Sequence, residues 1–249
     1  TPDYSSAASD VYKRQVAGSL QAHGGVNGGN GGHIETSGFD LDIANMKINV
    51  GSLSGFKNGE WLLDPYDYTL NDVSSISSAL SEGTNITIST STSSIPSFEY
   101  EDLSSGEYVT TSIGVDNPSD SSGGSIVLND SIIVSGPGSG DLTLQADEKI
   151  ILNSDIINTT GSGNLTLQSA EGIEMGSRVI SGEENYSEIS WETSESGSVR
   201  LISTSLGGLS GLSSENLIYV SRGSLEIDQA GDSTFPGLIK NVFALSLIH

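Results

Sequence analysis

The chain has 249 residues, of which 32 are acidic and nine are basic, and its formal net charge is −23. A field of that sign repels phosphate groups, so neither nucleic acid nor anionic lipid is expected as a partner. Cysteine is absent, which excludes disulfides, thiol chemistry and cysteine metal sites. No apolar stretch approaches the ~20 residues that span a bilayer, so no membrane insertion is expected.

The two ends of the chain do not continue the pattern of their neighbours. Residues 1–15 and 245–249 resemble translated sequencing-adaptor read-through. We therefore expect them to be non-native tails outside the fold, although a native disordered N-terminal tail is the alternative for the first of them. On this interpretation residues 16–240 form a single folded unit, and the chain is an internal fragment of a longer protein.

Residues 16–32 are rich in glycine, which predicts tight turns between very short strands. The run from Gly28 to His33 resembles a calcium-binding nonapeptide repeat. However, His33 stands where that repeat needs an aspartate, and no second copy follows. We therefore predict no metal site here, and no cofactor elsewhere in the chain.

Two specific runs follow. The first, GGHIETSG, leads into the alternating apolar residues Phe39, Leu41 and Ile43, which is typical of a half-buried strand. The second, GEWLLDPYDYTL, should end a strand at Pro65, because proline has no N–H for a ladder. We interpret Asp64 as a turn former that accepts backbone N–H bonds.

A single short helix is predicted within residues 69–92. Ile76, Ala79 and Leu80 recur at helical spacing, Ser74 or Ser75 serves as the N-cap, and Gly83 stops the helix. Residues 91–124 are rich in Ser, Asp and Pro. Because repeats resume after them, we predict a loop inserted between coils.

An internal repeat becomes visible after Gly124. GDLTLQA at Gly140 aligns with GNLTLQS at Gly163, and a second pair of blocks shares the same 23-residue period. Spacings of 16 residues from Gly124 to Gly140, and of 26 from Gly197 to Gly223, indicate turns of variable length between strands of fixed register. A unit this short with no helix suits one coil of a β-solenoid.

Stacking of coils buries the apolar faces that one coil cannot cover. Alternate Ser and Thr residues, Ser169 among them, should face solvent. Asn153 and Asn164 either stack as amide ladders or tolerate left-handed turns, and we favour the turns slightly. The residues expected to point inward are Trp61, Leu62, Leu142, Leu144, Ile150, Leu152, Ile156, Leu165 and Leu167.

The two runs together resemble the shaft of filamentous-haemagglutinin-type exoproteins exported by two-partner secretion. The resemblance covers roughly residues 24–91 by motif, and the rest of the chain only by repeat style. It implies an all-β, right-handed parallel β-helix with no catalytic residues, exported through an outer-membrane secretion pore of the two-partner type. The motif residues, to which we assign structural roles, are Gly31, Gly32, Glu35, Thr36, Ser37, Gly38, Trp61, Leu62, Leu63, Asp64, Pro65 and Asp67.

The sequence offers few candidate catalytic residues. With only His23, His33 and His249 available, a Ser-His-Asp triad is not expected. Asp64 and Asp67 are the pair that a carbohydrate-active β-helix enzyme would use, yet the motif offers no basic residue nearby. We therefore favour structural roles for both aspartates.

The sequence thus predicts a non-enzymatic shaft of a secreted or surface-exposed bacterial adhesin-like exoprotein. Its partner would be a receptor or glycan on a host or neighbouring cell. A polysaccharide lyase or hydrolase and a self-assembling surface-layer or biofilm module are the alternatives. An outward groove lined by Asp, Arg and aromatics would favour the enzyme. We also expect end-to-end self-association, because uncapped coils expose backbone groups and apolar faces.

Overall fold

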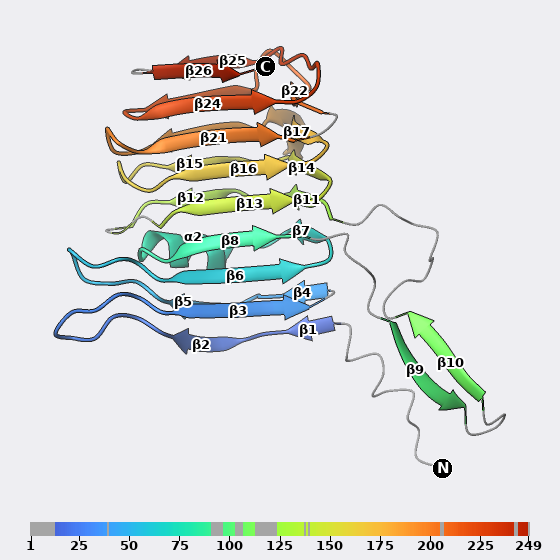
Figure 1. Ribbon diagram of the computed structural model, residues 1–249. Coiled ribbons are helices and arrows are strands. Elements are labelled where there is room, and N and C mark those ends of the chain that lie inside the picture. The colour runs from blue at the N-terminus through green and yellow to red at the C-terminus, as the bar shows by residue number, and fades with distance from the viewer. Residues whose placement is uncertain are drawn as a thin grey trace.

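The computed structural model describes residues 13–38, 40–90, 97–102, 107–112, 124–136, 138, 140–204, 207–241 and 244–248. Short strands stack in parallel and form three sheets around one continuous apolar core (Figure 1). The chain is therefore an all-β protein with the parallel β-helix architecture predicted from its repeats. The right-handed sense of the coil stays a prediction.

Sheet 1 is the longest sheet and contains eight strands, all paired in parallel. It faces the viewer in Figure 1 and runs from β3 to β26. In spatial order its strands are β3 (His33–Gly38), β6 (Glu60–Pro65), β8 (Asn85–Ser89), β13 (Leu142–Ala146), β16 (Leu165–Ser169), β21 (Ser198–Ser203), β24 (Ser224–Gln229) and β26 (Ala244–Ile248).

Two five-stranded parallel sheets complete most coils. Sheet 2 contains β7 (Tyr68–Leu70), β11 (Ile126–Leu128), β14 (Lys149–Leu152), β17 (Gly172–Met175) and β22 (Leu209–Gly211). Sheet 3 contains β12 (Ile132–Val134), β15 (Ile156–Asn158), β20 (Glu188–Glu192), β23 (Leu217–Ser221) and β25 (Leu238–Asn241). Two parallel pairs precede them: β1 (Lys13–Gln15) with β4 (Asp40–Asp42), and β2 (Gly18–Gln21) with β5 (Met46–Asn49).

The 23-residue period sets the strand pairing. Leu142 pairs with Leu165 in sheet 1, and Lys149 pairs with Gly172 in sheet 2, so each residue lies beside its counterpart in the next repeat. The 26-residue spacing likewise relates β21 to β24. The 16-residue spacing does not mark a coil, because β11 belongs to sheet 2 whereas β13 belongs to sheet 1.

The core is built from alternate residues of each strand. Of the residues expected inside, those that are fully buried are Trp61, Leu142, Leu144, Ile150, Leu152, Ile156, Leu165 and Leu167. Leu62 is the exception: it is only half-buried, and Leu63 takes the inward position because side chains alternate along a strand. Ser169, expected to face solvent, is buried, and its Oγ accepts the N–H of Gly172 at 2.9 Å.

Rows of polar side chains link successive coils at the corners between sheets. Asn153 Nδ2 donates to Asn129 Oδ1 at 2.9 Å, and Asn129 Nδ2 donates to Asn71 Oδ1 at 2.9 Å. At another corner, Asn164 Nδ2 donates to Asp141 Oδ1 at 3.0 Å. Both asparagines therefore join coils through their side chains. Neither has a positive φ, so our preference for left-handed turns was wrong.

The helix α2 (Ser74–Ser81) takes the place of a strand in the wall formed by sheet 3, because it contacts β5 on one side and β12 on the other. Ser77 Oγ accepts the N–H of Ile133 at 3.1 Å. Ser81 Oγ accepts the N–H of Ser135 at 3.2 Å. In a regular coil, carbonyl groups of a neighbouring strand would accept the N–H groups at and just beyond β12. Here the hydroxyl groups of two serines, one helical turn apart, accept them.

The predicted helix is confirmed, but its N-cap differs from our expectation. The N-cap is Val73, and Asp72 Oδ1 accepts the N–H of Ser74 at 2.9 Å. Gly83 follows the C-cap with a φ of 91°, a conformation that suits glycine and ends the helix as predicted. The described residues contain no helix that is long and apolar enough to cross a membrane.

Two antiparallel hairpins interrupt the coils. β8 and β11 flank residues 91–124, and both keep the parallel pairing of their sheets. The described part of the segment between them forms a hairpin of β9 (Ser97–Asp102) and β10 (Glu107–Ser112) (Figure 1). A second hairpin, of β18 (Ser177–Ile180) and β19 (Glu183–Tyr186), lies between β17 and β20 and was not predicted.

The strands β1 and β26 include residues of the two ends that we expected outside the fold. β1 pairs with β4, and β26 pairs with β24. These parts of the ends therefore continue the parallel ladders. Their non-native origin stays a prediction.

Candidate functional site

The two specific runs of the sequence become neighbouring strands. β3 and β6 pair in parallel over their whole length, from His33 opposite Glu60 to Gly38 opposite Pro65. β6 ends at Pro65, as predicted. The motif residues therefore form one two-strand unit within sheet 1.

Inside this unit a buried hydrogen bond joins the two strands. Trp61 Nε1 donates to Thr36 Oγ1 at 2.6 Å, and both side chains are buried. Glycines allow the preceding turns to approach closely, because a Cβ on Gly31 would collide with the carbonyl oxygen of Val50. These motif residues have structural roles.

Asp64 is not a turn former. It lies within β6, is mostly exposed, and pairs in register with Ser37. Neighbouring atoms still shield its carboxyl in part, and this desolvation, followed by the nearby charge of Glu35, raises its pKa. Among the hydrogen bonds of the described residues, none joins a backbone N–H to Asp64.

Asp67 takes the turn-forming role instead. Its Oδ1 accepts the N–H of Gly124 at 2.7 Å and the N–H of Ser125 at 2.9 Å. These bonds fix the chain where it returns from the inserted segment. The two aspartates proposed as a catalytic pair therefore have different surroundings, because Asp64 lies on the outer face of sheet 1 and Asp67 lies at a corner.

A groove lies between β4 and β7, where two successive coils are not hydrogen-bonded to each other. β3 and β6 pair in sheet 1, but their successors do not pair with each other, since β4 pairs with β1 and β7 pairs with β11. Cavities of about 400 and 200 Å³ lie along this groove. The larger one is lined by Asp40, Leu41, Tyr66, Asp67, Tyr68, Thr69 and Asn71.

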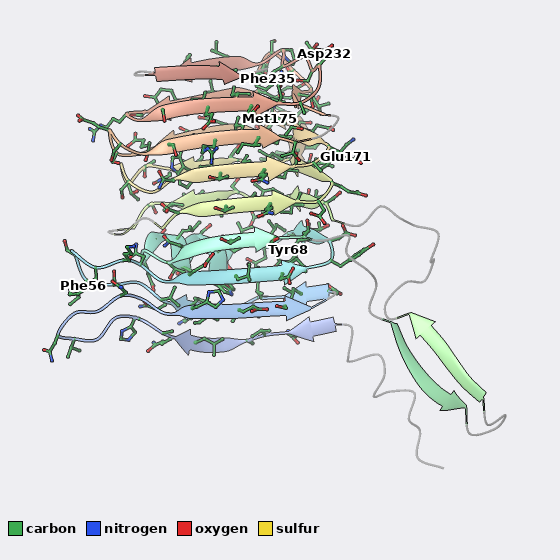
Figure 2. The ribbon with its side chains drawn as sticks, viewed as in Figure 1. Phe56, Tyr68, Glu171, Met175, Asp232 and Phe235 are labelled. Atoms are coloured by element: carbon green, nitrogen blue, oxygen red, sulfur yellow. The ribbon has the colours of Figure 1, made fainter. Side chains whose placement is uncertain are left out.

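The groove combines carboxylate groups with tyrosine side chains. Tyr68, labelled in Figure 2, is buried; desolvation and then the charges of Asp42 and Asp40 raise its pKa. Its phenol therefore stays protonated. The ring of Tyr66 lies in the lining beside carboxylate, hydroxyl and amide groups, which can form hydrogen bonds to a sugar, and the larger cavity falls within the ~300–1,000 Å³ usual for ligand pockets. The described lining of the larger cavity contains no Arg or Lys.

The described histidines do not build a catalytic triad. His33 Nδ1 lies 3.7 Å from a carboxylate oxygen of Glu60, and both side chains are about half exposed. His23 Nδ1 lies 2.8 Å from the carbonyl oxygen of Gly24. Within the part of the chain that the structure describes, no group of three or more acidic or histidine side chains is placed to hold a metal ion.

Comparison with known proteins finds no family model, no curated protein and no solved structure that matches the chain. The resemblance to filamentous-haemagglutinin-type exoproteins therefore depends on the sequence motifs.

Proposed function

We propose that the chain is a shaft segment of a secreted or surface-exposed bacterial adhesin-like exoprotein. The observation that supports this proposal most is sheet 1, in which eight strands keep parallel register around one apolar core. Adjacent strands lie ~4.8 Å apart, so eight of them give a rod of roughly 35 Å. Each inner strand is hydrogen-bonded on both edges, which makes such a rod stiff.

Export through an outer-membrane pore of the two-partner type is part of this proposal. A chain without cysteine can cross an oxidising compartment unfolded, because no disulfide traps it there. Outside the cell, stacking of coils would bury the core and complete the shaft. The shaft would then present a binding region to a receptor or glycan on a host or neighbouring cell.

Export is tested by placing the chain in the shaft of a two-partner-secreted exoprotein. We expect it at the cell surface or in the medium only when the pore is present. Leu144→Asp should leave the exported chain open to protease, because Leu144 is buried, whereas Gln145→Asp, on the exposed side of the same strand, should not. Equal release with and without the pore would contradict the proposal.

The groove between β4 and β7 favours a second function, a carbohydrate-active β-helix enzyme. Asp40 and Asp67 supply two carboxylates to its lining, and Tyr66 supplies a ring. The test is release of reducing ends or unsaturated products from neutral and acidic polysaccharides. Activity that Asp40→Asn abolishes would establish the enzyme. Absence of product from all the polysaccharides would contradict the enzyme.

A further inference from the structure

Two long turns stack on each other at the corner where the chain passes from the β2–β5 pair to sheet 1. Residues 22–32 precede β3 and residues 50–59 precede β6, and in Figure 1 both project beyond the strands. The N–H of Gly31 donates to the carbonyl of Lys57 at 2.9 Å, and Asn30 Oδ1 accepts the N–H of Lys57 at 3.0 Å. We call these two turns the double loop.

The double loop exposes apolar side chains and carries no acid. Val26, Leu53 and Phe56 are 91%, 53% and 47% exposed, and Figure 2 shows Phe56 on the projecting side. The chain has 32 acidic residues, yet the double loop contains none, and its Lys57 is exposed. Large apolar side chains gathered on one surface feature mark an interaction site.

The β18–β19 hairpin carries apolar side chains with the opposite charge. Val179 and Ile180 are 73% and 44% exposed, and they pair across the hairpin with Glu184 and Glu183. Ser181 and Gly182, with φ of 54° and 89°, make the two-residue turn that favours a tight hairpin. Paired residues share a face, so one face of the hairpin carries Val179 with Glu184 and the other carries Ile180 with Glu183.

The base of this hairpin is held in place. Ser177 Oγ donates to Glu184 at 2.7 Å, and the Tyr186 hydroxyl donates to the same carboxylate at 3.0 Å. Arg178 lies 3.9 Å from Asp155, which precedes β15. The hairpin lies between β17 and β20, at the corner from sheet 2 to sheet 3, so it occupies a different corner from the double loop.

We propose that the double loop of one copy docks on the β18–β19 hairpin of a second copy, so that shafts associate side by side. The apolar side chains of the double loop would meet one face of the hairpin, and Lys57 would approach the glutamate on that face. Because the two surfaces differ, the contact is heterologous and can repeat into an open-ended bundle. Small contacts, below ~1,200 Å², are usually transient, so each single contact is weak.

Sedimentation velocity of the whole chain over a concentration series, in about 50 mM salt, tests the charges. Lys57→Glu should weaken association about tenfold, and so should Glu183→Lys with Glu184→Lys. The triple variant exchanges the charges between the surfaces and should restore association. Lys149→Glu is the control, because it reverses the charge of an exposed lysine on β14 and should leave side-by-side association unchanged.

The apolar part is tested with Val26→Ser and Leu53→Ser, which change exposed side chains and should also weaken association. The proposal is overturned if the chain stays monomeric, if Lys149→Glu weakens association as much as Lys57→Glu, or if the triple variant fails to restore it. Binding of the double loop to zwitterionic vesicles without self-association would assign it to a lipid surface and would also overturn the proposal.

Discussion

Hydrogen bonding explains which small polar residues enter the core. Thr36 is buried because the indole N–H of Trp61 needs an acceptor there, and Ser169 is buried where the N–H of Gly172 needs one. No buried side-chain nitrogen or oxygen among the described residues is left without a partner. Alternation alone cannot identify such positions, and it cannot choose between Leu62 and Leu63 in the run of three apolar residues that begins at Trp61.

The inward register of sheet 1 predicts a large difference between two adjacent residues. Leu144→Asp buries an unpaired carboxylate and should lower the free energy of unfolding by several kcal/mol. Gln145→Asp changes the exposed neighbour and should stay within ~0.5 kcal/mol. Urea unfolding of both variants measures this difference, and equal midpoints would show that the assigned register is wrong.

The bond between Trp61 and Thr36 predicts a specific coupling. Thr36→Val keeps the shape but leaves the indole N–H unpaired, which should destabilise the fold by about 1–3 kcal/mol. Trp61→Phe combined with Thr36→Val should cost less than the sum of the single changes, because neither partner is then left unpaired. A double-mutant cycle in urea measures the coupling, and additive effects would contradict the bond.

At the scale of elements, the sequence predicted what depends on repetition. The 23-residue spacing predicted the pairing of β13 with β16 and of β14 with β17, because stacked coils place equivalent residues side by side. It did not predict the groove, which depends on β4 and β7 failing to pair. The β18–β19 hairpin was also missed, although Ser181-Gly182 between two short runs is a recognisable turn signal.

The position of α2 leads to a prediction about its serines. Ser77 and Ser81 accept the N–H groups of Ile133 and Ser135, so Ser77→Ala with Ser81→Ala should cost about 1–2 kcal/mol. Ser78→Ala is the control, since Ser78 is exposed and alanine favours a helix, so it should be neutral or slightly stabilising. Thermal unfolding compares them. If the double variant is as stable as Ser78→Ala, the serines do not support β12.

At the scale of the whole molecule, one apolar core is enclosed by a strongly acidic chain. The net charge of −23 repels copies from each other in low salt, and this repulsion is weakest at segments without acidic residues, such as the double loop. The strand edges are different, because they attract partners through backbone groups and not through charge. Salt should therefore strengthen end-to-end stacking through strand edges and weaken the side-by-side contact between charged surfaces.

End-to-end stacking is the association expected at high salt. Among the described strands, β26 pairs only with β24 and β3 pairs only with β6, so both edges of sheet 1 carry backbone groups without a strand partner. The edge of sheet 2 is covered in part, since Gln229 Oε1 accepts the N–H of Leu209 at 3.2 Å. Stacking should therefore proceed through sheet 1.

Raising the salt from about 50 mM to about 1 M shortens the screening length from above 10 Å to about 3 Å and removes most repulsion between copies. We expect longer rods of unchanged width in electron micrographs at high salt, and appending a polar capping coil should prevent them. The side-by-side contact of Lys57 with the hairpin glutamate should weaken under the same conditions. Rods that disappear with Lys57→Glu at high salt would show that strand edges do not drive their growth.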